Sequence, residues 1–203
     1  MPQVADYWTA LAPTFDAEPD HGLRSPVVRA AWAARLREWV PGTGADVVDV
    51  GCGTGSLSLL LAEQGHRVVG VDASTGMLAQ ARQKFADAGH DVPFLQADAA
   101  AIPVRPGRFD VVLARHVLWA LPDPVAALRH WVRLLRPGGW LVLIEGRWAA
   151  GDGSTPWSGG VPADVLTAAV APLVARVHNE LLADARLWGK EIRDERYVLL
   201  AGR

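Results

Sequence analysis

Three glycines at alternate positions form the cluster of this sequence that is chemically most informative. They lie in DVGCGTG, residues 49–55, directly after a short β-branched run. Glycine lets a backbone turn sharply and approach a ligand closely, and a helix that starts there points its N-terminal amides over the loop. The third glycine comes one residue too early for the dinucleotide motif GxGxxG, and Ser56 occupies the last motif position. By itself the cluster indicates either a ligand-binding loop or merely a tight strand-to-helix turn.

Two carboxylates follow the next two apolar runs and narrow this choice. Asp72 ends the second run, 17 residues after Gly55, and Asp98 lies just past the third run in QADA, residues 96–99. A carboxylate at the position of Asp72 can accept hydrogen bonds from both hydroxyls of a ribose. One at the position of Asp98 can accept a hydrogen bond from an exocyclic amine such as adenine N6. Ligands bind at the carboxyl ends of the strands in open α/β sheets. The three features together therefore predict a nucleoside site.

Two histidines are the candidates for acid–base chemistry, because site histidines are often tuned near neutrality. His116 follows the fourth apolar run, and His21 lies in Asp20-His21-Gly22. For His116 two interpretations stay open, a general base or a residue that is merely hydrogen-bonded at a strand end. For His21 a surface turn is the simpler interpretation, and a cap segment that folds it over a ligand is the alternative.

Large aromatic side chains and one further carboxylate are candidates for contact with a substrate. Tyr7 and Trp8 either close over a ligand or anchor a short helix, while Trp119 and Trp148 lie in loops expected beyond the fourth and fifth strands. Flat, rigid rings of this kind suit an aromatic or cationic ligand. Glu145 ends the fifth expected strand, where it contacts a substrate or bonds a backbone amide or an arginine.

Alternating strands and helices are expected to position these residues. Helices are predicted for residues 26–40, 57–64, 74–88 and 123–135, and the strands in order are 46–50, 67–71, 92–96, 109–114 and 140–144. This alternation is typical of βαβ units and a parallel sheet. The strands are continuous apolar runs, as a sheet covered on both faces requires.

The C-terminal part of the sequence is less decisive. Residues 162–171 are predicted to be a helix, and residues 175–182 and 196–201 are predicted strands, the first with a helical alternative. If both are strands, the short link between them makes them an antiparallel pair at one edge of the sheet.

Four segments carry a family resemblance and span residues 46–146 almost without interruption: VVDVGCGTGSLSLLLAEQGHRVVGVDASTGMLAQAR, FLQADAAAIP, FDVVLARHVLWALPDP and LLRPGGWLVLIEG. Together they resemble the class I S-adenosylmethionine-dependent methyltransferase superfamily, within it the small-molecule branch that includes ubiquinone/menaquinone-type enzymes. The resemblance implies an α/β fold: a Rossmann-like, seven-stranded, mostly parallel sheet with helices on both faces and an antiparallel last strand. It further implies that both final strands are added in reversed direction at the edge.

The resemblance also implies roles for individual residues of a cofactor site that takes S-adenosylmethionine and releases S-adenosylhomocysteine. By position, Asp49, Gly51, Gly53 and Gly55 line the methionine part, Asp72 holds the ribose, Met77 packs on adenine, Asp98 followed by Ala99 bonds the adenine amine, and Arg115 begins the segment that faces the methionine end.

The chemistry so implied is transfer of a methyl group to an O, N, S or C atom of a small molecule, such as a secondary metabolite, by in-line displacement. Such a step depends mostly on proximity and orientation, and it needs a base only where the nucleophile must lose a proton. The sequence contains neither HExxH nor paired CxxC motifs, so no catalytic metal is expected. The alternatives are a methyltransferase-like protein with another reaction, such as a cyclisation, or a non-catalytic partner. The glycine spacing disfavours a nicotinamide oxidoreductase.

Size and composition agree with an ordinary globular enzyme domain. The 203 residues carry a formal net charge of −2, and a single cysteine, Cys52, excludes an internal disulfide. Without a basic face, nucleic-acid partners are disfavoured. No signal peptide or membrane helix is expected, so the predicted protein is a cytoplasmic monomer or small homo-oligomer. The predicted organisation is a cap segment, residues 1–24, followed by a methyltransferase domain, residues 25–203.

Overall fold

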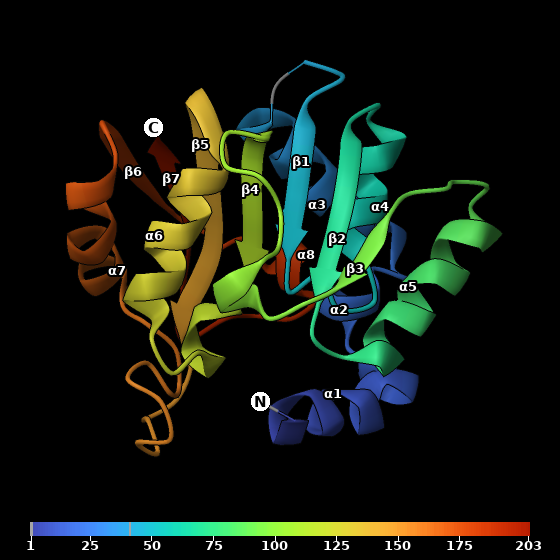
Figure 1. Ribbon diagram of the computed structural model, residues 1–203. Helices are drawn as coiled ribbons and strands as arrows, with labels where there is room; N and C mark the ends of the chain where they lie inside the picture. Colours follow the sequence, from blue (N-terminus) through green and yellow to red (C-terminus); the bar gives the residue numbers. More distant parts are fainter. Residues whose placement is uncertain (1, 41) are drawn as a thin grey trace. The chain divides into compact units, whose positions relative to one another are not determined.

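The computed structural model describes residues 2–40 and 42–203. The chain divides into two compact units, whose helices and strands are labelled in Figure 1. Unit 1 comprises Met1–Ala99 together with Asp184–Glu191, and unit 2 comprises Ala100–Ala183 together with Ile192–Arg203. Each unit contributes strands of one seven-stranded sheet together with its own helices, and we describe each unit by itself.

The sheet of unit 1 is parallel and has the order β3-β2-β1. Its strands are β1 (Asp46–Val50), β2 (Arg67–Asp72) and β3 (Phe94–Gln96). All five residues of β1 are buried, as its valine-rich run predicts for a covered strand. Helices α4 (Ser56–Glu63) and α5 (Thr75–Asp87) connect the strands and pack against β2. Ser74 caps α5 as predicted, because its Oγ accepts from the amide of Met77 at 3.1 Å.

Four further helices complete unit 1: α1 (Pro2–Phe15), α2 (Pro19–Gly22), α3 (Pro26–Trp39) and α8 (Ala185–Trp188). Helix α1 packs against α5, where the hydroxyls of Thr9 and Ser74 lie 2.9 Å apart. Helix α3 holds α8 through Trp32, whose indole Nε1 donates to the carbonyl of Leu187 at 2.6 Å and whose ring meets Trp188 edge to face. Both indoles are fully buried, so they supply a large share of the local apolar core.

The sheet of unit 2 has the order β4-β5-β7-β6. Its strands are β4 (Phe109–Arg115), β5 (Leu135–Arg147), β6 (Arg176–Leu181) and β7 (Glu195–Gly202). Strand β4 is parallel to β5, while β7 is antiparallel to both β5 and β6. Helix α6 (Pro124–Leu134) packs on β4 and β5, and α7 (Ala163–Val170) packs on β6 and β7 (Figure 1). Three short 3₁₀ turns are η1 (Ala99–Ala101), η2 (Leu118–Ala120) and η3 (Ala171–Leu173).

The last strands correct one expectation and settle another. Residues 176–181 form a strand, so the helical alternative for this segment was wrong. The expectation that both final strands are reversed was also wrong, because only β7 is antiparallel, and β6 runs in the direction of β5. The two strands pair antiparallel across their short link, as expected, so a β7 that is reversed relative to β5 leaves β6 running in the direction of β5.

Strand β5 is also longer than the predicted range of residues 140–144, since it extends from Leu135 to Arg147. Within the described residues, no helix has the length and apolar character that crossing a membrane requires.

Candidate active site

The glycine-rich loop makes the sharp turn that its sequence predicts. Gly51, Gly53 and Gly55 all have positive φ angles, of 66°, 54° and 77°. A side chain would strain each of them, because L-residues rarely adopt this region. Gly55 is the N-cap residue of α4, so the loop leads directly into the amino end of that helix. The backbone can therefore approach a ligand closely there, with helix amides nearby.

Asp72 is joined to this loop by direct hydrogen bonds. Its Oδ2 accepts from the amide of Gly53 at 2.9 Å, and its Oδ1 accepts from the amide of Ser74 at 2.8 Å. Burial raises the pKa of Asp72, and the bonds from these amides oppose that rise. Each carboxylate oxygen has two lone pairs, so both can still accept from a ligand. The structure thus brings together the ribose candidate and the glycine loop that the sequence paired with it.

The other cofactor candidates of unit 1 lie around this loop and differ in exposure. Asp49 is buried and accepts from the hydroxyl of Ser58 at 2.5 Å, which fixes its carboxylate toward α4. Met77 is buried at the start of α5. Asp98 is exposed and is followed by the half-buried Ala99. The preceding amide, that of Ala97, donates to the carbonyl of Asp72 at 3.1 Å, which places this stretch of backbone beside Asp72.

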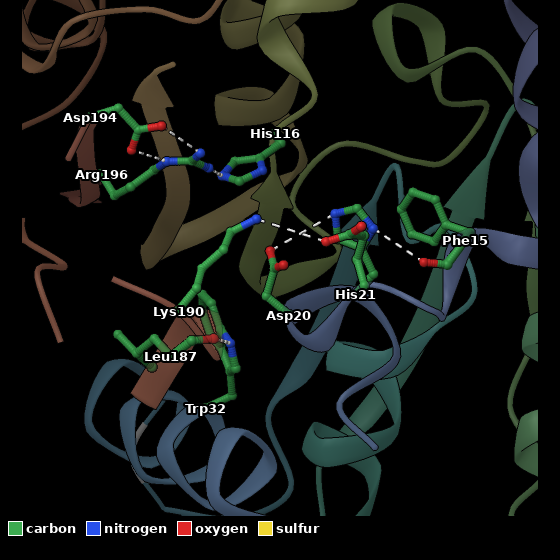
Figure 2. A network of polar contacts seen from close by, with 10 residues as sticks. Phe15, Asp20, His21, Trp32, His116, Leu187, Lys190, Asp194 and Arg196 are labelled. Carbon is green, nitrogen blue, oxygen red and sulfur yellow. Dashed lines mark hydrogen bonds and ion pairs between the residues drawn. The ribbon is translucent and has the colours of Figure 1, made fainter. Parts of the chain in front are cut away.

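An N-terminal aromatic cluster, composed of Tyr7, Trp8, Phe15 and His21, lies on the glycine loop. A Cβ at Gly53 would be 3.6 Å from Cε1 of Phe15, so that ring covers the glycine. His21 stacks on Phe15 with 4.2 Å between ring centroids, and its Nδ1 donates to the Phe15 carbonyl at 3.2 Å (Figure 2). Trp8 meets Phe15 and Tyr7 edge to face. His21 is therefore part of a packed cluster, with Phe15 as the link between the predicted residues.

A buried ion pair adds a second link that sequence reasoning missed. Lys84 Nζ lies 2.8 Å from Asp16 Oδ2 and donates to the hydroxyl of Ser56 at 2.6 Å, while the hydroxyl of Thr54 donates to Asp16 Oδ1 at 2.5 Å. Burial lowers the pKa of Lys84, and Asp16 opposes that change. No local pattern could reveal this pair, because its partners are separated by most of unit 1 in sequence. It fastens the end of α1 to the glycine loop.

In unit 2, His116 occupies a strained turn directly after β4. Its φ of 54° lies in the left-handed region, which non-glycine residues rarely adopt. The amide of His116 donates to the carbonyl of Ile144 at 3.0 Å, and its own carbonyl accepts from Nε1 of Trp119 at 2.7 Å. The hydroxyl of Thr155 donates to the carbonyl of Trp119. Hydrogen bonds thus hold the turn at both the amide and the carbonyl of His116.

Glu145 supplies the remaining bonds of this turn. Its Oε1 accepts from the amides of Val117 and Leu118, each at 3.1 Å, which is the backbone-amide alternative that the sequence had left open. The side chain is fully buried, and Oε2 has no hydrogen-bond partner among the described residues. Burial raises the pKa of Glu145 to about 8, although the two amides and the charge of Arg196 act in the opposite direction.

The side chain of His116 belongs to a small cluster with Trp148, Arg196 and Asp194, and Figure 2 shows the last two beside it. Its Nε2 lies 3.5 Å from Nη1 of Arg196, and its ring is 4.8 Å from that of Trp148. A guanidinium can only donate, so this contact uses the lone pair of Nε2. Asp194 accepts from Arg196 at 2.8 and 2.9 Å and holds it in place, while the Arg196 guanidinium also lies over the Trp148 ring.

Arg196 and Asp194 were missed because they lie near the C-terminus, far from every motif. Trp119 adds a second indole ring to this cluster through an edge-to-face contact with Trp148. Arg115 is half-buried at the end of β4, in register with Ile144 of β5. In the described part of the chain, no three His, Cys, Asp or Glu side chains are grouped as a metal site would require.

Comparison with known proteins connects these features to one family. Residues 48–143, from β1 to β5, match the family described as a methyltransferase domain. The match begins just before the glycine loop and ends just before Glu145, so it includes Asp72, Asp98 and His116. The family resemblance predicted from the sequence is confirmed for this part of the chain.

Individual relatives agree with this assignment. The chain is 43% identical over 101 residues to a demethylmenaquinone methyltransferase from Thermus thermophilus. The aligned region is 49% of this chain and 46% of the relative. The chain spans less than half the length of the first curated relatives that it matches.

Two solved structures show the same fold at low sequence identity. The [4+2]-cyclase SpnF has a TM-score of 0.79 at 20% identity, over 99% of this chain and 95% of its own. Magnesium protoporphyrin IX methyltransferase from Synechocystis, solved with bound S-adenosylmethionine, has a TM-score of 0.66 at 23% identity, over 86% of this chain and 77% of its own. The predicted Rossmann-like class, with seven mostly parallel strands and an antiparallel last strand, is confirmed.

Proposed function

We propose that this protein is an S-adenosylmethionine-dependent methyltransferase that acts on an O, N, S or C atom of a small molecule. The observation that carries the proposal is the hydrogen bond between Asp72 and Gly53, which joins a ribose-binding carboxylate to a glycine turn. The family match of residues 48–143 supports the same reaction class.

The residues of unit 1 fit this cofactor chemically. Asp72 is the acceptor for the ribose hydroxyls, Asp98 the acceptor for the adenine amine, and Met77 an apolar contact for the ring. Gly51, Gly53 and Gly55, with Asp49, would line the methionine part. When bound, the cofactor supplies a methyl group on a positively charged sulfur, and the protein must orient the acceptor in line with it.

The residues of unit 2 are proposed to hold the acceptor. His116 orients it or takes its proton, since a histidine can do either near neutral pH. Trp119 and Trp148 provide flat apolar surfaces beside His116. Arg115 is assigned to the methionine end of the cofactor. For Glu145, the bonds to the amides of Val117 and Leu118 favour the backbone-amide alternative over contact with a substrate.

The N-terminal segment is proposed to act as a cap of residues 1–24 on a methyltransferase domain of residues 25–203. Phe15 on Gly53 and the Asp16–Lys84 ion pair support this division, because both fasten the segment to the glycine loop. Tyr7, Trp8 and His21 are carried on the same segment. We further propose a cytoplasmic monomer or small homo-oligomer that binds no nucleic acid, in keeping with a formal net charge of −2.

Calorimetric titration of the purified protein with S-adenosylmethionine, S-adenosylhomocysteine and NADH tests the cofactor. We expect micromolar binding of the two sulfur nucleosides and none of NADH. Absence of binding by both sulfur nucleosides would refute the proposal and favour a non-catalytic partner protein.

Acceptor screening by mass spectrometry follows, with a gain of one methyl group per product molecule as the expected result. The fold alone does not decide the reaction, since SpnF, a [4+2]-cyclase, shares it. Turnover of an acceptor with the cofactor left intact would indicate a non-methylating reaction.

A further inference from the structure

The carboxyl of Glu145 is a buried polar group that the proposed reaction does not use. It is fully buried, and one of its oxygens has no hydrogen-bond partner among the described residues. Burying such a group costs free energy that an apolar side chain of similar size would not. Packing alone therefore gives no reason for a glutamate here, and its bonds must account for it.

Those bonds all go to the turn that carries His116. The amides of three consecutive residues, 116 to 118, donate to two consecutive residues of β5: His116 to the carbonyl of Ile144, and Val117 and Leu118 to Oε1 of Glu145. A left-handed φ is unfavourable for a residue other than glycine, and strained residues of this kind gather at functional sites. Without Glu145, two of the three amide bonds that hold the strained His116 turn would be lost.

We propose that Glu145 is a positioning residue, which fixes the turn of His116 through its bonds to the amides of Val117 and Leu118 and so sets the direction of the imidazole. The inference rests on the proposed function for its catalytic consequence. The positioning itself depends only on the bonds within unit 2.

The charged and titratable groups around Glu145 are consistent with this role. His116 approaches from the end of β4, and Arg196 and Tyr197 approach from β7, where Tyr197 is paired in register with Glu145. The hydroxyl of Tyr197 donates to the carbonyl of Val161, and Arg196 donates to Asp194, so neither of these bonds goes to Glu145. A pKa of about 8 keeps Glu145 neutral at pH 7, when its Oε1 accepts as an amide oxygen would. A glutamine at position 145 should therefore accept the same two amide bonds.

Three variants separate positioning from general stability. Glu145→Gln keeps the acceptor oxygen, Glu145→Leu removes it at similar volume, and Val142→Ala is a matched control that perturbs another fully buried position of β5. In hydrogen exchange followed by NMR, we expect the amides of Val117 and Leu118 to lose at least tenfold protection in Glu145→Leu. Protection in Glu145→Gln should stay within about threefold of the parent protein. Undiminished protection in Glu145→Leu would overturn the proposal.

Two further measurements complete the test. In the parent protein, the amide resonances of Val117 and Leu118 should show one titration step near pH 8 that Glu145→Gln lacks. If Glu145→Leu does not fold, a tenfold or greater loss of protection at these two amides in the folded Glu145→Gln would overturn the proposal. With an acceptor in hand, kcat should fall at least tenfold in Glu145→Leu and not in Glu145→Gln, at unchanged cofactor affinity. An equal fall in Val142→Ala would refute positioning, whereas failure to bind S-adenosylmethionine would refute the proposed function and leave the exchange result intact.

Discussion

Asp72 and Glu145 are two carboxylates that both bind backbone amides, but they use their oxygens differently. Asp72 accepts one amide with each oxygen, from Gly53 and Ser74, and stays partly exposed. Glu145 accepts two amides with one oxygen, leaves the other without a partner and is fully buried. Asp72 thus remains open to a ligand, while Glu145 serves the protein's own backbone.

The contrast indicates how the two units divide their tasks. In unit 1, the proposed role of the carboxylate and the glycine turn is to accept the hydroxyls of a nucleoside. In unit 2, the proposed role of the buried carboxyl is to position the strained turn of His116. The following predictions test that division, from the largest expected effect to the smallest.

Replacement of His116 by alanine should have the largest effect on the reaction. If His116 acts as general base, kcat should fall about 10²–10⁴-fold while the affinity for S-adenosylmethionine changes little, because most of the proposed cofactor contacts lie in unit 1. Steady-state kinetics on the identified acceptor, combined with calorimetry, measures both quantities. Equal kcat in the variant and the parent would remove His116 as a base.

Glu145→Gln should remove a large part of the dependence of folding stability on pH. The pKa of Glu145 is raised to about 8 in the folded protein from an ordinary value of 4.5, so the stabilising contribution is complete below pH 4.5 and is lost as the pH rises through 8. The parent should lose up to about 1.4 kcal/mol per pH unit within this window from this group, and Glu145→Gln should lack that slope. Denaturant unfolding at pH 5, 6.5 and 8 measures it. Parallel slopes in the two proteins would contradict the burial argument.

Substitution of Asp72 by alanine should weaken cofactor binding by about 1–3 kcal/mol, roughly the cost of a lost hydrogen-bonding carboxylate. Asp72→Asn is the matched variant, since it retains one acceptor oxygen, and it should lose less affinity. Calorimetric titration with S-adenosylhomocysteine measures the affinity of the parent protein and of both variants. Unchanged affinity in both variants would show that the ribose assignment is wrong.

The smallest effect concerns the backbone of His116 itself. Because its φ is 54°, glycine should suit this position better than alanine, and His116→Gly should be about 1 kcal/mol more stable than His116→Ala. Urea unfolding of the two variants compares them directly. A more stable alanine variant would mean that the turn relaxes once the imidazole is gone.

The sequence determined the fold class and most of the binding side through local patterns. The β-branched run of β1, the glycines that follow it and the Ser74 cap act within a few residues, so their conformation follows from steric limits and adjacent hydrogen bonds. Spacing alone also placed Asp72 at a strand end. The direction of β6 was mistaken, because it follows from the antiparallel pairing of β6 with β7 and of β7 with β5, and not from the residues of β6 alone.

Only the tertiary structure decided the partners that lie far apart in the chain. It placed Asp16 on Lys84, Phe15 on Gly53 and Arg196 beside His116. It also turned Glu145 from a substrate candidate into the acceptor for two backbone amides. A side chain at a strand end has the same type and spacing whether it faces a ligand or a neighbouring turn. Its burial and its bonding partners, which arise only when distant segments pack together, determine which of the two it serves.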